Sequence, residues 1–228
     1  MFSAIILAGG QGLRLKAAVP KPLVKIKSLP AIIYSLSILS KHPDVDEIIV
    51  VVNAKNQRAI NRLIRNYAFK KIKSVVLGGR RRQDSVYSGL KMVSGNSDWV
   101  LIHDSARPFV DRKVITKVIL AAKKTGAAIL GVPVKATIKS VKKSLLVDKT
   151  IDRGNLWEIQ TPQVFRKELI LEAYKKYGKE KVTDDASLVE KLGADVLVVQ
   201  GSYQNIKITT GEDLLFAGLI AQRFLHAI

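Results

Sequence analysis

A glycine-rich segment near the start of the chain, followed by two spaced cations, has the residue types that bind phosphate. Residues 8–12 (Ala-Gly-Gly-Gln-Gly) come directly after the apolar run 3–7, and Arg14 and Lys21 follow them. Glycine lets backbone N–H groups close around phosphate oxygens, and the cations neutralise charge that the amides cannot. This order predicts a nucleotide-binding loop at the end of a buried strand.

Two common glycine loops do not fit this segment. A Walker loop needs Gly-Lys followed by Ser or Thr, but Gly178 and Lys179 are followed by Glu180. The dinucleotide pattern G-x-G-x-x-G would need glycine where Leu15 stands. A turn that merely joins two elements stays the alternative, and the two cations weigh against it.

Polar groups also follow three later predicted strands. Residues 78–85 (Gly-Gly-Arg-Arg-Arg-Gln-Asp-Ser) follow strand 74–77, residues 104–108 (Asp-Ser-Ala-Arg-Pro) follow strand 99–103, and Thr137 follows a strand that ends near Val134. Ligands of open α/β sheets gather at the carboxyl ends of the strands. The sequence therefore predicts one rim that collects two glycine turns, several arginines, a lysine and an aspartate.

Short β-branched runs alternate with amphipathic stretches along the chain, and this alternation must position the rim. The predicted strands are 3–7, 47–52, 74–77, 99–103, 127–132, 195–199 and 206–208. The predicted helices are 30–39, 56–67, 84–93, 114–125, 167–176, 185–192 and one that begins at Glu212. Apolar strands in βα alternation indicate a Rossmann-like, mostly parallel sheet in a three-layer α/β/α sandwich. We expect one domain over residues 1–228.

Residues 135–153 depart from this pattern. Val, Lys and Thr alternate there and are interrupted by Lys142, Lys143 and Ser144, which indicates an exposed two-stranded arm. Because an isolated two-stranded ribbon is marginally stable, the arm needs a partner. We therefore expect a homodimer formed through residues 135–153.

Composition excludes several classes of protein. The chain has no Cys, which excludes disulfides and thiolate catalysis, and its N-terminus lacks the pattern of a signal peptide, so we expect a cytoplasmic protein. The net charge of +19 suggests nucleic acid, but the cations are spread along the whole chain and aromatic residues make up only 6%. Nucleic acid is therefore an unfavoured partner, and no apolar run is long enough to cross a membrane.

Eight motifs in sequence order resemble the 2-C-methyl-D-erythritol 4-phosphate cytidylyltransferase family. They are A-G-G-x-G-x-R, P-K, G-G-x-x-R-Q-D-S-V, H-D-S-A-R-P-F, D-R-x-x-L-W, T-P-Q-x-F, T-D-D-A-S and N-I-K-I-T, between Ala8 and Thr209. The resemblance implies the fold of nucleotide-diphospho-sugar transferases, CTP and a polyol phosphate as substrates, and Mg²⁺ as cofactor. It also implies that arms of two subunits clasp near each other's sites.

The resemblance carries over residue by residue. It implies catalytic roles for Arg14, Lys21, Arg153 and Lys207. It implies nucleotide binding by Ala8, Gly9, Gly10, Gly12, Gly79, Arg82, Ser85, Asp104 and Ser105. It implies substrate binding by Asp104, Arg107, Thr137, Thr161 and Thr183, with Asp104 also placed beside the metal. His103 and His42 receive no role, and His42 is expected at the surface.

The identity of the acceptor stays open at this point. The family more often has an aspartate where this chain has Ala136, beside the threonine of the polyol pocket. A sister family that uses ribitol 5-phosphate shares the nucleotide loops, so another polyol phosphate is the nearest alternative. A nucleotide- or RNA-binding protein without catalysis is the alternative from a different class, and the presence of both cation pairs weighs against it.

Overall fold

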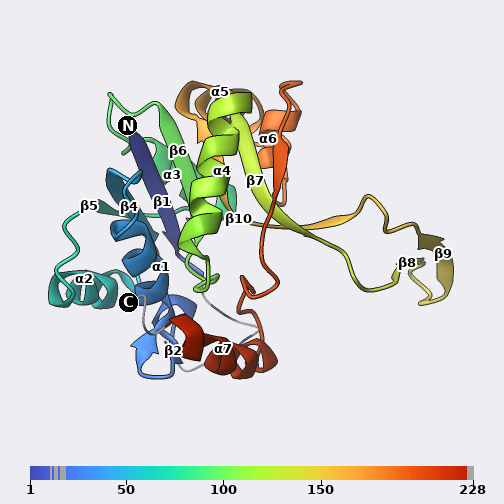
Figure 1. The fold of residues 1–228 in the computed structure, drawn as a ribbon, viewed down its shortest axis with the longest axis horizontal. Coiled ribbons are helices and arrows are strands. Elements are labelled where there is room, and N and C mark those ends of the chain that lie inside the picture. Colours follow the sequence, from blue (N-terminus) through green and yellow to red (C-terminus); the bar gives the residue numbers. More distant parts are fainter. Residues whose placement is uncertain (11, 13–14, 16–18, 225–228) are drawn as a thin grey trace.

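A seven-stranded sheet forms the centre of the molecule in the computed structural model, which describes residues 1–10, 12, 15 and 19–224 (Figure 1). The strand order is β11-β7-β10-β6-β1-β4-β5, and β10 alone runs antiparallel to its neighbours. The strands are β1 (Phe2–Ala8), β4 (Glu47–Val52), β5 (Ile72–Leu77), β6 (Trp99–Asp104), β7 (Ala127–Pro133), β10 (Trp157–Arg166) and β11 (Leu197–Gln200). The predicted mostly parallel sheet is confirmed.

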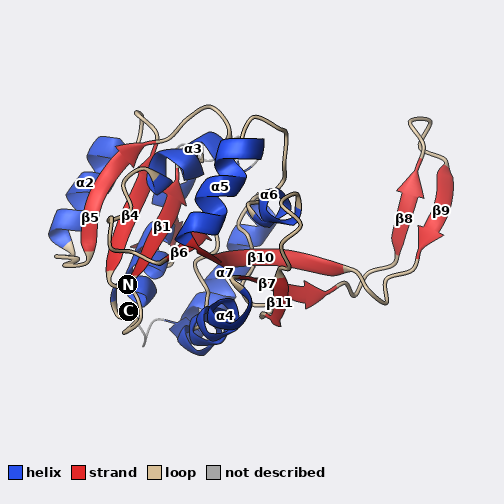
Figure 2. Ribbon diagram, turned by 90° about the horizontal axis from the view of Figure 1, so that it is seen from above, coloured by secondary structure: helices blue, strands red, loops and turns tan. Residues whose placement is uncertain are grey.

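Helices cover both faces of this sheet (Figure 2). One face carries α1 (Ala31–Ser40), α2 (Gln57–Asn66) and α4 (Arg112–Thr125), and the other carries α3 (Arg82–Leu90), α5 (Lys167–Tyr177) and α6 (Ala186–Glu190). Side chains alternate between the faces along each strand: Ala4 and Ile6 pack with α1, whereas Ile5 packs with α3. Strands buried on both faces must be apolar throughout, which explains the continuous runs in β1 and β4.

A smaller apolar cluster lies beside the main core. The closing helix α7 (Gly211–Phe224) packs there against the short hairpin of β2 (Lys25–Ile26) and β3 (Leu29–Pro30). The 3-10 turn η2 (Lys21–Leu23) leads into this hairpin. The cluster thus holds the segment that follows Lys21 against α7.

Three details differ from the sequence predictions. The long strand β10 was missed, because its Thr-Pro-Gln centre reads as a turn, although the register shift between Gln160 and Gln163 accommodates it inside the sheet. The strand predicted at 206–208 is wrong: this segment is irregular and is attached by the Ile208 N–H, which donates to the Ala106 carbonyl at 2.9 Å. Helix α6 is also shorter than predicted.

The arm stands away from the body, as Figures 1 and 2 show. It consists of β8 (Ile138–Val141) and β9 (Val147–Ile151), which pair antiparallel in a sheet of their own. At its tip Leu145 is 85% exposed and Leu146 67%. The predicted two-stranded arm is confirmed, and its part in dimerisation stays a prediction.

His42 is not at the surface, so that prediction is wrong. It lies in the connection between α1 and β4, is completely buried, and its Nε2 lies 3.1 Å from the Thr116 hydroxyl of α4. Burial lowers its pKa, and Asp44 partly opposes this. None of the helices in the described ranges is long and apolar enough to cross a bilayer. The cytoplasmic location stays a prediction.

Candidate nucleotide-binding and catalytic site

The carboxyl ends of β1, β5 and β6 meet at one edge of the sheet, as predicted. A cavity of about 250 Å³ lies between the segments that follow these strands. Its lining includes Gly9, Gly10, Lys21, Gly79, Arg82, Ser85, Asp104, Ser105 and Lys207. Most of the nucleotide-binding residues predicted from the sequence are therefore brought together, and two of the predicted catalytic lysines join them.

The first glycine loop is held by the polypeptide around it. Gly12 has a φ of +69°, and a Cβ there would lie 3.1 Å from Cβ of Lys21, so glycine is required at this turn. The Asn56 side chain donates to the Ala8 carbonyl, and Asn53 donates to the Gly9 carbonyl, both at 2.7 Å. Sequence reasoning missed both asparagines, although they follow β4 at the same rim.

The second glycine loop wraps around the start of α3. A Cβ on Gly79 would lie 2.3 Å from Cβ of Asp84, a contact no other residue could make without moving the loop. Asp84 accepts from the Arg81 backbone N–H at 3.0 Å and from its guanidinium. The Ser85 hydroxyl lies within this turn, 3.2 Å from the Arg81 carbonyl.

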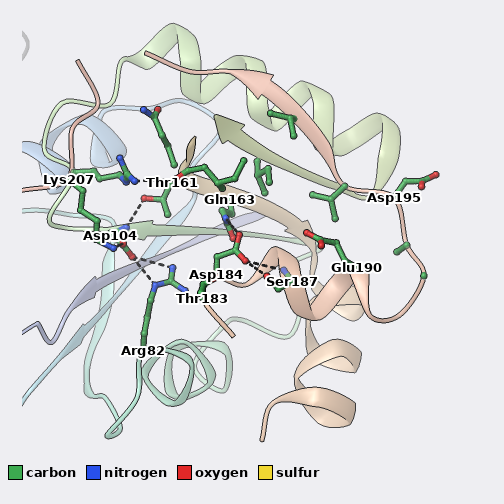
Figure 3. Close-up of a pocket in the computed structure, with 18 residues that line it drawn as sticks. Arg82, Asp104, Thr161, Gln163, Thr183, Asp184, Ser187, Glu190, Asp195 and Lys207 are labelled. Carbon is green, nitrogen blue, oxygen red and sulfur yellow. Dashed lines mark hydrogen bonds and ion pairs between the residues drawn. The ribbon is translucent and has the colours of Figure 1, made fainter. Parts of the chain in front are cut away.

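Lys207, Asp104, Arg82 and Asp185 form a connected series of charges across the base of the rim, and Figure 3 shows the first three of them. Lys207 Nζ lies 2.6 Å from Oδ2 of Asp104, and Arg82 Nη2 lies 3.2 Å from Oδ1 of the same carboxylate. Arg82 also contacts Asp185 at 2.9 Å, and Asp185 accepts from the Tyr174 hydroxyl at 2.6 Å. Together these contacts hold Arg82 between two carboxylates.

The neighbouring charges determine whether Asp104 and Arg82 are ionised. Burial alone raises the pKa of Asp104, but the charges of Arg82 and Lys207 outweigh it and hold that pKa well below its usual range. Burial disfavours the charged form of Arg82, yet Asp185 and Asp104 raise its pKa above its usual range. Asp104 is therefore a carboxylate and Arg82 a cation at neutral pH.

A second cavity, of about 730 Å³, opens beside the first and shares Arg82, Asp104 and Lys207 with it. Arg107, Thr161 and Thr183, predicted to bind the substrate, are among its lining residues. Figure 3 shows that Glu190 and Asp195 lie at the end of this cavity far from Lys207. The shared cluster thus lies at the junction of two cavities.

Arg107 supports the loop that carries Lys207. Its side chain is buried, and it donates to the carbonyls of Asn205 at 2.7 Å and Ile159 at 3.2 Å. Burial lowers the pKa of Arg107. Asn205 in turn donates to the Thr161 carbonyl at 2.9 Å. The N-I-K-I-T segment is therefore fixed to β10 and to the turn after β6.

Two predicted site residues of the described structure, Thr137 and Arg153, lie away from both cavities. Thr137 and Arg153 are exposed on the arm and line neither cavity, and Arg153 instead donates to the Lys135 carbonyl. Arg14 lies outside the described residues. The rim of a single subunit therefore gathers the predicted nucleotide side of the site and only part of the acceptor side.

Asp104 is the only acidic side chain predicted to lie beside a metal, and the structure tests that fit. Among residues 1–10, 12, 15 and 19–224, no three His, Cys, Asp or Glu side chains come together as a ligand set. Asp104 offers one carboxylate, which Lys207 and Arg82 share. This fits Mg²⁺ of the kind that takes one carboxylate and draws its other ligands from substrate phosphates and water.

Known proteins resemble this chain in both sequence and fold. The family model "IspD: 2-C-methyl-D-erythritol 4-phosphate cytidylyltransferase" matches residues 2–223. A protein of that name from Shouchella clausii is 44% identical over 224 residues, 97% of each chain. The crystal structure of 4-diphosphocytidyl-2C-methyl-D-erythritol synthase from Anaerococcus prevotii superposes with a TM-score of 0.86 at 37% identity, covering 98% of this chain and 96% of that one. The corresponding Thermus thermophilus cytidylyltransferase gives a TM-score of 0.79 at 28% identity, covering 97% and 100%.

Proposed function

The chain belongs to the 2-C-methyl-D-erythritol 4-phosphate cytidylyltransferase family and is a nucleotidyltransferase, and from that premise we propose its reaction. It transfers CMP from CTP to 2-C-methyl-D-erythritol 4-phosphate, giving 4-diphosphocytidyl-2-C-methyl-D-erythritol and pyrophosphate. The observation that carries this proposal is the Lys207–Asp104–Arg82 cluster at the junction of two cavities. Two substrates that meet end to end need such a junction.

CTP occupies the smaller cavity in this proposal. The loop of residues 8–12 with Lys21 surrounds the triphosphate, and the loop of Gly79 to Ser85 surrounds the cytosine. Backbone groups and the Ser85 hydroxyl can read the edge of the base, whereas glycine amides favour phosphate oxygens. The phosphate of the acceptor lies at Lys207, with Arg107 supporting the loop beneath it.

The chemistry is an in-line displacement at the α-phosphorus. A phosphate oxygen of the acceptor forms the new P–O bond while the bond to the β-phosphate oxygen breaks and pyrophosphate leaves. The acceptor is a phosphomonoester with a second pKa of about 6, so it is largely ionised at neutral pH and needs no general base. Catalysis then comes from positioning and from neutralising charge, which suits a rim rich in Lys and Arg.

The proposed cofactor is Mg²⁺, held by Asp104 together with the triphosphate. When bound, the ion reduces the repulsion between the anionic substrates. Lys21 and Arg14 are proposed to neutralise charge on the same triphosphate. Asp104 also orients Lys207, since its carboxylate lies 2.6 Å from Nζ.

We also propose that the active unit is a homodimer in which the arm of one subunit completes the site of the other. Thr137 and Arg153, assigned to the acceptor side, are exposed on the arm and line neither cavity of their own subunit. Leu145 and Leu146 at the tip are largely exposed, which is costly for an arm that packs on nothing. Isologous association supplies a partner to both arms at once.

Mixing two inactive variants tests this arrangement. Arg153→Ala and Lys207→Ala subunits each lack one part of the site, but a heterodimer of the two has one complete site if Arg153 acts on the partner. After random exchange of subunits, activity returns to about a quarter of the wild-type value. No recovery, with dimers present by light scattering, places Arg153 in its own subunit; monomers refute the dimer.

Pyrophosphate release tests the reaction itself. The purified chain is given CTP and Mg²⁺ with methylerythritol phosphate or with ribitol 5-phosphate, and ATP, GTP and UTP replace CTP as controls. We expect the highest kcat/KM with CTP and methylerythritol phosphate. A preference for ribitol 5-phosphate keeps the fold and chemistry but changes the acceptor, which is the alternative that Ala136 leaves open.

A further inference from the structure

His103 is buried directly behind Asp104, and the sequence analysis assigned it no role. It is the penultimate residue of β6, its side chain is completely buried, and it is followed directly by Asp104. Its Nε2 lies 3.0 Å from the Arg107 carbonyl, and its Nδ1 lies 3.1 Å from the Thr161 hydroxyl. Each ring nitrogen therefore has its own hydrogen-bond partner.

The partners determine the direction of every hydrogen bond in this group. A carbonyl oxygen only accepts, so Nε2 of His103 must carry the proton and donate to Arg107. In a neutral ring Nδ1 is then the acceptor, and the Thr161 hydroxyl must donate to it. The Asp104 backbone N–H donates to the oxygen of that same hydroxyl at 3.0 Å. The bonds thus run in one direction from Asp104 through Thr161 and His103 to Arg107.

The first and last residues of this series of hydrogen bonds, Asp104 and Arg107, belong to the same turn, residues 104–107. The Arg107 N–H donates to the Asp104 carbonyl at 2.9 Å, which closes the turn of residues 104–107. The Ile208 N–H donates to the Ala106 carbonyl at 2.9 Å, and Arg107 holds the Asn205 carbonyl, so the loop of Lys207 is attached to this turn. A shift of the turn therefore moves the Asp104 carboxylate and Lys207 together.

We propose that His103 is a positioning residue for phosphoryl transfer, which fixes the turn of residues 104–107 and thereby the Asp104–Lys207 pair, by donating from Nε2 and accepting at Nδ1. The role rests on the proposed function, because it places groups assigned to that reaction. His103 contacts neither cavity, so it acts through Asp104 and Lys207 rather than on the substrates. A side chain of equal size without both polar atoms cannot replace it.

Three variants separate the two bonds. His103→Gln keeps a donor near the position of Nε2, His103→Asn keeps an acceptor near the position of Nδ1, and His103→Phe removes both. His42→Phe is the matched control, because His42 is equally buried and contacts a threonine hydroxyl, but it lies at the amino end of β4, away from the rim. All four are compared with wild type for Tm, Kd for CTP, kcat and KM for the acceptor.

We expect His103→Phe to lower kcat/KM for the acceptor by about ten- to a hundredfold, the loss that misplacing reacting groups by about 1 Å causes. We expect the kcat/KM values of His103→Gln and His103→Asn to lie between those of His103→Phe and wild type. His42→Phe lowers Tm by a similar amount but leaves the kinetics of the folded enzyme unchanged. If His103→Phe and His42→Phe lower Tm equally and both keep wild-type kinetics, His103 has only a structural role.

Thr161 provides a second test. Thr161→Val removes the hydroxyl between Asp104 and His103, and Thr161→Ser keeps it. We expect Thr161→Val to lower kcat/KM for the acceptor as much as His103→Phe does, Thr161→Ser to lower it less than Thr161→Val, and the double variant His103→Phe with Thr161→Val to be no worse than either single variant. If the losses in kcat/KM of the two single variants multiply in the double variant, His103 and Thr161 do not act through the same hydrogen bonds.

The ring itself can be observed without any turnover. The chain has only three histidines, so the side-chain ¹⁵N signals are readily assigned with the His103 variants. A neutral ring protonated at Nε2 supports the bond directions, and protonation at Nδ1 overturns them. Because this readout does not depend on activity, failure of the proposed reaction is distinguishable from failure of the positioning role.

Discussion

Asp185 is the buried counter-charge of Arg82, and replacing it by Asn tests how the nucleotide side of the site is held. Its side chain is 1% exposed, it accepts from Tyr174 at 2.6 Å, and its Oδ2 lies 2.9 Å from Arg82. Asp185→Asn keeps the shape and the bond to Tyr174 but removes the charge. Among the described residues, Asp104 at 3.2 Å is then the one anionic partner left to the guanidinium.

The size of the effect follows from this geometry. Removing one partner of a fully buried ion pair costs about 3–5 kcal/mol, but Arg82 is 29% exposed and keeps Asp104, so we expect about 2–3 kcal/mol. For a chain of this length that lowers Tm by roughly 4–12 °C. Because Arg82 lines the nucleotide cavity, its displacement raises KM for CTP by about tenfold.

Thermal unfolding and steady-state kinetics check both expectations. Asp184→Asn is the matched control, because Asp184 accepts from Gln163 at 2.8 Å and contacts no arginine in the described structure. We expect Asp184→Asn to lower the free energy of unfolding by about 1 kcal/mol and to leave KM for CTP unchanged. If Asp185→Asn leaves both Tm and KM for CTP at wild-type values, Asp185 does not hold Arg82 and the reasoning is refuted.

Three further predictions concern other parts of the chain. Lys21→Ala lowers kcat about a hundredfold or more but weakens CTP binding, measured by calorimetry, by much less; equal losses contradict a transition-state role. Asn56→Ala removes the bond to the Ala8 carbonyl, weakens CTP binding in the same assay, and lowers the free energy of unfolding by about 1–2 kcal/mol; unaltered binding means that the loop holds its shape without this bond. Burial lowers the pKa of His42, so its contribution to stability is complete above a pH of about 6.5 and is lost as the pH falls, because the unfolded chain then binds a proton that the folded chain does not. In His42→Phe this part of the pH dependence disappears from denaturant unfolding curves between pH 7 and 5, and an unchanged slope contradicts the assignment.

Periodicity was sufficient for the elements whose apolar residues face a core. The runs of β1 and β4 are buried on both faces, so their sequences are continuously apolar and their positions follow directly. The same rule failed for residues 206–208, where Ile206 and Ile208 flank Lys207 as they would in a strand. There the alternation reflects a loop with one buried side chain, Ile208, and one exposed cation.

Site residues that line the cavities were predictable from glycine turns and motifs. Residues that hold those side chains in place without lining a cavity were not. Gly79, Asp104 and Lys207 were found because glycine turns and motifs mark them. Asp185 and His103 stand in the motifs T-D-D-A-S and H-D-S-A-R-P-F but received no role, because the motifs do not show which side chains they contact. Their roles depend on contacts between residues far apart in sequence, such as His103 with Thr161, which only the folded chain brings together.

In the proposed reaction, CMP is joined to a polyol phosphate at the junction of the two cavities. Mass spectrometry of a reaction of the wild-type chain with CTP, Mg²⁺ and methylerythritol phosphate tests it most directly. We predict a diphosphate-linked cytidyl product formed in equal amount with pyrophosphate. Tight binding of CTP without such a product, or CMP released by hydrolysis alone, would contradict the proposed transfer.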